Sequence, residues 1–344
     1  MVATLKDVAL MAGVSVKTVS NVVNGHAFVK DSNRARVLSA IEHLGYQPNL
    51  AARNLRAGRT GVIGLAVPEL SFSYFAELAD AVLVAARRRG YVVLIEQTGG
   101  DRETELELLR GSRVSMLDGL LFSPLGMFND DAPALDVRYP LVLLGERIFD
   151  GPTDHVPIQN VNGARTATEH LIKGGRRSIA VLGAHLGEMV GSAALRLDGN
   201  RQALESHGIE YSEDLIVFRE GWHRTDGAEA TQELIDRGVA FDAVFALNDE
   251  LALGALRVLH QEGIRVPEQV WVMGFDNVIE SQFAMPSLST IDPGRAEIAE
   301  QAVSALIERI SDATGTVGPP RLLDVPFSLI ARESAPVTEL VTQL

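Results

Sequence analysis

The sequence predicts a multidomain protein, with an all-α helix-turn-helix domain at the N-terminus followed by a bilobed α/β body built on two parallel sheets. Three observations support this prediction. Short amphipathic helices fill the first 47 residues, apolar strand-like runs alternate with amphipathic stretches from residue 61 onward, and this alternation occurs in two halves of similar length. A chain of 344 residues is long enough for two or three domains.

The N-terminal segment contains three short predicted helices. Residues 5–12 repeat apolar side chains at the spacing of one helix face, and Gly13 breaks the pattern. A second helix over 16–24 follows a short turn, and a third begins near residues 31–32 and stops at Gly45. Two short helices joined by a glycine-containing turn of about three residues are typical of the helix-turn-helix motif, which binds DNA.

Charge is distributed unevenly along the chain. The net charge of −14 is unusual for a DNA-binding protein, but residues 1–60 carry eight Lys and Arg against three Asp and Glu, whereas the remainder carries 23 basic and 42 acidic residues. A basic head can approach phosphates while an acidic body repels them. A charged segment is by itself more often a solvated surface, so this pattern only adds to the helical motif.

A short segment connects the helical domain to the body. Pro48 favours a helix start, the helix expected over 49–56 is too short to be stable alone, and residues 57–61 have the composition of a linker. We therefore divide the chain into a DNA-binding domain (1–47), a hinge helix with linker (48–60) and a body (61–344).

The body reads as a series of strands and helices in alternation. Each helix separates two apolar runs, which predicts parallel strands with helices on both faces of a sheet. Two such halves make a bilobed body, and such bodies bind ligands in the cleft at the carboxyl ends of the strands. The predicted strands are 62–68, 91–96, 118–123 and 140–146 in the first half, and 178–183, 215–218, 243–247 and 270–275 in the second.

Several classes of protein are excluded by what the sequence lacks. It has no cysteine, no apolar run of about 20 residues and no secretory signal pattern, so we expect a cytoplasmic protein with no membrane contact. None of the common nucleotide-binding, hydrolase or metalloprotease motifs occurs, and the eight histidines lack metal-ligand spacing. We therefore expect no enzymatic activity, no cofactor and no metal site.

Five segments spread over the whole chain contain recognisable sequence motifs. They read TLKDVALMAGVSVKTVSNVVNG (4–25), GYQPNLAARNLRAGRTGVIGL (45–65), VFALNDELALGAL (244–256), VPEQVWVMGFDN (266–277) and LIARESA (329–335). In these segments the sequence resembles the lactose-repressor (LacI/GalR) family of bacterial transcriptional regulators. The first segment is the most specific, because sugar-binding receptors share the body fold. The resemblance implies a periplasmic-binding-protein-like body.

The resemblance also implies a function. It indicates a sequence-specific DNA-binding repressor of carbohydrate-utilisation genes, whose affinity for a pseudo-palindromic operator is controlled by a sugar effector bound between the lobes. No long heptad repeat follows residue 335, so a homodimer is expected rather than a tetramer. The alternatives are a nucleoside or purine-like effector, an activator, and a sugar transport receptor, which would lack the helical domain. Whether ligand releases or promotes DNA binding stays open.

The resemblance places base recognition on the second helix. Val16, Lys17 and Asn21 would contact base edges, because a methyl group, an ammonium and a carboxamide match thymine, guanine and adenine in the major groove. The other candidates on or near this helix act as phosphate contacts or as helix caps, with a cap equally expected for Ser15. They are Thr4, Ser15, Thr18, Ser20 and Asn24.

The hinge supplies three further candidates. An exposed leucine at the end of a marginal helix is hard to explain structurally, and the resemblance makes Leu55 a wedge between base pairs in the minor groove. Ala52 permits close approach and Arg56 can follow into the groove. The alternative is that Leu55 packs on the body.

The effector residues implied by the resemblance are Ser192, Arg196, Trp222, Asn248 and Asp276. In the first lobe, Glu69, Ser73, Tyr74 and Phe75 follow the first strand and could line the cleft. Guanidinium, carboxylate and amide groups suit sugar hydroxyls, and an indole suits the flat face of the ring. Each has a structural alternative, namely a helix cap for Asn248, a turn for Asp276 and the core for Trp222 and Phe75. The chain departs from the family pattern at Gly145-Glu146-Arg147 and at Pro293, which leaves the identity of the ligand open.

Overall fold

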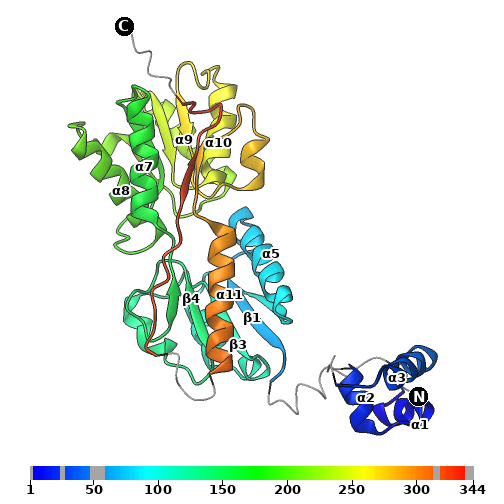
Figure 1. Cartoon of the computed structure of the whole chain (residues 1–344). Coiled ribbons are helices and arrows are strands. Elements are labelled where there is room, and N and C mark those ends of the chain that lie inside the picture. Colours follow the sequence, from blue (N-terminus) through cyan, green and yellow to red (C-terminus); the bar gives the residue numbers. More distant parts are fainter. Residues whose placement is uncertain (1–2, 24–27, 47–58, 313–317, 338–344) are drawn as a thin grey trace. The chain divides into compact units, whose positions relative to one another are not determined.

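The computed structural model describes residues 3–23, 28–46, 59–312 and 318–337 and divides the chain into two compact units, 1–61 and 62–344 (Figure 1). The first unit is helical and the second is an α/β body. This architecture confirms the predicted fold class.

The N-terminal unit consists of α1 (Leu5–Ala12), α2 (Val16–Val23) and α3 (Asp31–Leu44). The side chains of Val8, Val19 and Val37 are fully buried where the three helices meet. Gly13 ends α1 in the left-handed region at φ 60°, a backbone conformation that side chains with a Cβ rarely adopt. Arg36 of α3 donates from Nε to the carbonyl oxygen of Ala12 at 2.8 Å, which ties α3 to the turn between α1 and α2.

The first half of the body, here called the N-lobe, is a five-stranded parallel sheet of order β2-β1-β3-β4-β5. Its strands are β1 (Val62–Val67), β2 (Val92–Gln97), β3 (Gly119–Phe122), β4 (Leu141–Leu144) and β5 (Asp154–Val156). Helices α5 (Ser73–Arg88) and α11 (Arg295–Ser311) cover one face, where Ile63, Leu65 and Val67 point, and α6 (Arg102–Arg110) covers the other. Successive side chains of β1 point to opposite faces of the sheet, so this strand contributes to the hydrophobic core on each face.

The second half, here called the C-lobe, is a four-stranded parallel sheet of order β7-β6-β8-β9. Its strands are β6 (Ile179–Ala184), β7 (Ile216–Phe218), β8 (Ala243–Ala246) and β9 (Trp271–Met273). Its helices are α7 (Asn160–Lys173), α8 (Ser192–Ser206), α9 (Arg224–Asp236) and α10 (Asp249–Gln261), with α7 packed on α8 and α9 on α10.

The C-terminal part of the chain contributes one element to each lobe. After the short strand β10 (Thr290–Asp292), α11 packs back into the N-lobe core, and β11 (Ser328–Ile330) then pairs antiparallel with β10 beside the C-lobe (Figure 1). Both lobes are therefore built from separate stretches of sequence. Among the described residues, no helix is both long and apolar enough to span a membrane.

Candidate functional sites

The candidate DNA-reading surface is the exposed side of α2. Val16 and Lys17 are exposed on its first turn, and Asn21 follows Lys17 by four residues, which places both on one helix face. An apolar side chain such as Val16, 41% exposed on this turn, is suited to a partner rather than to the core. Asn24, Ala52, Leu55 and Arg56 lie outside the described residues.

Two of the predicted phosphate contacts also cap helices. The hydroxyl of Ser15 accepts a hydrogen bond from the backbone N–H of Thr18 at 3.1 Å and so caps α2. Thr4 forms a capping box with Asp7 at the start of α1. The cap role expected for Ser15 is therefore present in the structure, and Ser15 holds the start of α2, the helix that carries Thr18 and Ser20.

A cavity of ≈ 280 Å³ lies between the two lobes of the body. Residues that follow β1, β3 and β4 line it from the N-lobe, and residues that follow β6, β7, β8 and β9 line it from the C-lobe. This is the position at the carboxyl ends of parallel strands where α/β bodies bind ligands. Six of the seven predicted effector residues contribute to its wall: Phe75, Ser192, Arg196, Trp222, Asn248 and Asp276.

Ser73 is placed differently. Its hydroxyl donates to Glu250 Oε1 at 2.6 Å, so this N-lobe residue contacts the C-lobe outside the cavity wall. The next residue, Tyr74, lines the cavity instead, and burial together with the nearby carboxylates of Glu146 and Asp276 raises the pKa of its hydroxyl. The phenol therefore remains a neutral hydrogen-bonding group in the site.

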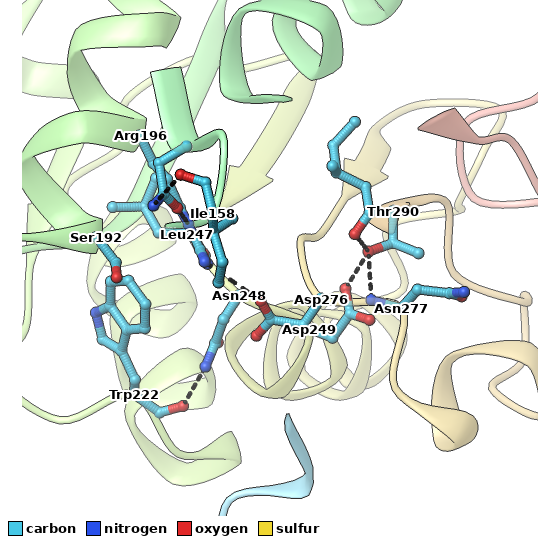
Figure 2. A network of polar contacts seen from close by, with 12 residues as sticks. Ile158, Ser192, Arg196, Trp222, Leu247, Asn248, Asp249, Asp276, Asn277 and Thr290 are labelled. Carbon is cyan, nitrogen blue, oxygen red and sulfur yellow. Dashed lines mark hydrogen bonds and ion pairs between the residues drawn. The ribbon is translucent and has the colours of Figure 1, made fainter. Parts of the chain in front are cut away.

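Arg196, on α8, is the centre of the polar network (Figure 2). Arg196 is 2% exposed, and its guanidinium donates to Asn160 Oδ1 at 2.6 Å, to the carbonyl oxygen of Leu247, and to Asp276 Oδ1 at 3.3 Å. The guanidinium carbon lies 3.7 Å from the centre of the Phe275 ring. These three bonds use three of the five N–H donors of the side chain. Arg196 thus fixes the end of β8 and the Asp276 carboxylate in one arrangement.

Asp276 follows the last strand of the C-lobe sheet in a strained conformation. Its φ of 112° is rare for a residue with a side chain, and strain of this kind is found at binding sites. Burial raises its pKa to about 6, against the opposing effect of the guanidinium groups of Arg196 and Arg295. Arg295 Nη1 also donates to the carbonyl oxygen of Asp276 at 2.7 Å, which connects this turn to α11.

Asp249 lies close to Asp276 in the same network and accepts a hydrogen bond from Thr290 (Figure 2) and two more from residues near the turn. The donors are the hydroxyl of Thr290 at 2.6 Å, the hydroxyl of Ser281 at 2.7 Å and the backbone N–H of Val278 at 3.0 Å. Burial, together with the Asp276 carboxylate, raises the pKa of Asp249 to about 7 against these hydrogen bonds. Asp249 therefore organises the turn that presents Asp276.

The raised pKa of Asp249 predicts a pH dependence of stability. Its ordinary pKa is 3.8, so folding favours the protonated form, and the stability that it contributes declines as pH rises from about 4 to about 7. Each pH unit inside this window changes the free energy of unfolding by at most about 1.4 kcal/mol for one group. We expect the wild type to lose about 2 kcal/mol more than Asp249→Asn between pH 5.5 and pH 7.5. Parallel thermal-melting curves for the two proteins over this range would contradict the assignment.

Asn248 and Trp222 support each other. The Asn248 side-chain oxygen accepts from the backbone N–H of Leu251 at 2.8 Å, which caps α10, and its amide nitrogen donates to the carbonyl oxygen of Trp222 at 3.0 Å. The indole N–H of Trp222 donates to the carbonyl oxygen of Gly183 at 2.7 Å. The cap expected as an alternative for Asn248 is thus present, and the residue lines the cavity as well.

Glu146 and Arg147 of the N-lobe both contact the C-lobe at the cavity wall. Ser192 Oγ of the C-lobe donates to Glu146 Oε2 of the N-lobe at 2.7 Å. Arg147 Nη1 of the N-lobe donates to the carbonyl oxygen of Val190 at 3.1 Å and lies 3.5 Å from Glu188 Oε1, both in the C-lobe. Glu146 and Arg147, where the sequence departs from the pattern it resembles, are therefore among the residues that connect the lobes.

Sequence reasoning missed part of the cavity wall. His185 and Glu188 belong to the loop between β6 and α8 and line the cavity, as do Glu220 and His223 after β7. Their position in the sequence could have predicted this, because these segments follow C-lobe strands at the sheet edge where ligands bind. Among the described residues, no group of three or more His, Cys, Asp and Glu could hold a metal ion.

Comparison with known proteins places the chain in a family. Residues 4–49 match the bacterial regulatory proteins of the lacI family, and residues 168–335 match the periplasmic binding protein-like domain. The HTH-type transcriptional repressor PurR of Haemophilus influenzae (strain PittEE) is 34% identical over 340 residues, which cover 96% of this chain and 98% of the relative. The chain belongs to the lacI family.

Solved structures agree with this assignment. The Lac repressor dimer bound to operator and an anti-inducer is 27% identical to this lacI-family protein, with a TM-score of 0.82 over 98% of this chain and 100% of that chain. The complex of the transcriptional regulator CelR with cellobiose is 32% identical, with a TM-score of 0.71 over 96% and 99% of the two chains. This lacI-family protein is accordingly a DNA-binding transcriptional regulator and not an enzyme.

Proposed function

We propose that this lacI-family protein is a repressor whose affinity for a pseudo-palindromic operator is controlled by a sugar bound between the lobes. The observation that carries the proposal is the composition of the cavity wall. Asp276 and Ser192 offer hydrogen-bonding groups on one side, and Trp222 and Phe75 offer apolar ring surfaces. Polar groups at fixed positions among aromatic rings suit a polyol. The similar transcriptional regulator CelR is solved in complex with cellobiose.

In this proposal the N-terminal domain reads DNA through α2. Val16, Lys17 and Asn21 contact base edges in the major groove, and Thr4, Ser15, Thr18 and Ser20 contact phosphates near the starts of α1 and α2. Asn24 and the hinge residues Ala52, Leu55 and Arg56 complete the contact surface, with Leu55 in the minor groove. The head (1–47), hinge (48–60) and body (61–344) are the corresponding domains.

A second copy of the chain is the proposed partner of the body. The strand β2 forms an edge of the N-lobe sheet, and its side chains Val92 and Leu94 are 57% and 52% exposed. Val84 of α5 and Phe283 and Met285 of the C-lobe are also exposed apolar residues. An exposed apolar edge strand needs a cover, and a two-fold operator calls for two heads.

The effector is proposed to act through the lobe-crossing contacts. A ligand seated between Ser192 and Glu146 changes the contacts that hold the lobes at their present angle. A change in that angle moves the start of β1, to which the hinge is joined. A short hinge helix forms only with partner packing, so this motion controls specific DNA binding. By linkage, DNA changes ligand affinity by the same factor.

The test is an operator-binding titration with the full chain. An operator is first selected in vitro from random pseudo-palindromes, and its affinity is then measured by fluorescence anisotropy with mono- and disaccharides and with nucleosides. A sugar that changes operator affinity by about tenfold or more, a coupling of about 1.4 kcal/mol, supports the proposal. A response to nucleosides alone would replace the sugar by a nucleoside, and a response to neither would refute effector control by either class.

A further inference from the structure

Charged side chains are unusually frequent in the wall of the cavity. Five carboxylates face it, against two guanidinium groups and two imidazoles. The carboxylates are Glu69, Glu146, Glu188, Glu220 and Asp276, and the basic side chains are Arg147, Arg196, His185 and His223. Acidic groups are therefore in excess, even if both imidazoles carry a proton.

Each guanidinium group in the wall already has a carboxylate partner. Arg196 pairs with Asp276, and both are nearly inaccessible to solvent. Arg147 lies 3.5 Å from Glu188, and the two side chains are only 12% and 9% exposed. A buried guanidinium group that is paired with a carboxylate cannot bind a ligand anion without giving up that carboxylate.

The imidazoles are paired in the same way. His185 Nδ1 is within hydrogen-bond distance of Glu188 Oε2, and His223 Nε2 lies 3.6 Å from Glu69 Oε2. His223 thus has a carboxylate of its own, whereas His185 shares Glu188 with Arg147.

The helix end that could attract an anion is occupied as well. Helix α8 starts at Ser192 in the cavity wall, and helix N-termini attract negative groups. The carboxylate of Glu146 lies there and accepts from the hydroxyl of Ser192 at 2.7 Å and from the backbone N–H of Ile158 at 3.0 Å. Glu146 therefore fills, from within the chain, the place that a ligand phosphate or carboxylate would take.

We propose that the cavity admits uncharged ligands and rejects anionic ones, phosphate esters above all. This inference rests on the proposed function of the cavity as the effector site. A phosphate monoester carries about −1.5 to −2 charges at neutral pH, and it would meet an acidic wall with no unpaired guanidinium group. The hydroxyls of an uncharged sugar can bond to the same carboxylates at no electrostatic cost.

The inference predicts that removal of one wall carboxylate creates an anion site. Glu188→Gln leaves Arg147 without its carboxylate partner, and Glu146→Gln removes the negative charge at the start of α8. Inorganic phosphate is the probe, and its binding is measured by calorimetry and by thermal melting of the full chain at constant ionic strength, with chloride as the reference. We expect no phosphate binding by the wild type, and at least about tenfold tighter phosphate binding by Glu188→Gln.

Glu103→Gln is the matched control, because Glu103 pairs with Arg102 at 3.1 Å on the exposed surface of α6. It removes the same charge and one arginine contact outside the cavity, where Arg102 keeps Asp131 as a second partner, and it should behave as the wild type. Phosphate binding by the wild type that Arg147→Gln abolishes would overturn the inference. So would folded Glu188→Gln and Glu146→Gln proteins that bind phosphate no better than Glu103→Gln. Neither result depends on the operator titration, so this inference and the proposed function can fail separately.

Discussion

Truncation of Arg196 to alanine is expected to destabilise the body by about 3–5 kcal/mol, because it leaves the buried carboxylate of Asp276 without its partner. The carbonyl oxygen of Leu247 and the side chain of Asn160 lose their donors at the same time. For a domain of this size the melting temperature should fall by roughly 10 °C. Calorimetric melting of the full chain measures the effect.

Arg201→Ala is the control for this substitution. Arg201 lies on the same helix, α8, but is exposed and contacts only the ring of Tyr211, with its guanidinium carbon 4.8 Å from the ring centre, among the contacts described. Its loss should cost about 1 kcal/mol or less. If Arg196→Ala is no less stable than Arg201→Ala, the network of Figure 2 does not hold the C-lobe turn together.

Asn21→Ala is expected to reduce operator affinity by about 1–3 kcal/mol, or roughly 5- to 150-fold, because a carboxamide pairs with adenine through two hydrogen bonds. The fold should be unaffected, since the side chain lies on the outer part of α2 and not in the core formed around Val19. Anisotropy with the selected operator, and with a set in which each base pair of a half-site is changed, measures the effect.

Measurements with this set of altered operators distinguish base recognition from non-specific binding to the DNA backbone. A base contact at Asn21 relaxes discrimination at one position of each half-site and leaves binding to unrelated DNA unchanged. Ser39→Ala, on the exposed surface of α3, should change neither quantity. An equal loss of affinity for all sequences would show that Asn21 contacts the backbone instead.

Local features of the sequence predicted most of the fold. Gly13 and Gly45 mark the ends of α1 and α3 because left-handed backbone at a helix end favours glycine. The apolar runs of the body predicted the strands because buried parallel strands are apolar on both faces. The return of α11 to the N-lobe and the pairing of β10 with β11 were not predicted, since such contacts join residues far apart and leave no periodic signal.

The cavity was predicted less completely than the fold. Most wall residues could be located because they follow the carboxyl end of a strand. Successive residues of a helix point about 100° apart, so the exact start of α5 decides whether Ser73 or Tyr74 points into the cavity. The strained φ of Asp276 depends on its contacts with Arg196 and Arg295, which sequence does not show. Glu188 lies in an irregular loop, where no pattern predicts the direction of a side chain.

The distribution of each lobe over separate stretches of chain has a consequence for biosynthesis. The face of the N-lobe sheet formed by Ile63, Leu65 and Val67 is covered in part by α11, which lies close to the C-terminal end of the sequence. A ribosome therefore completes every strand of both parallel sheets before this apolar face can be closed. Nascent chains with such incomplete cores are prone to aggregate and are substrates for chaperones. The described core of the helical head is formed by side chains within residues 3–46, so the head can fold while the body is still being translated.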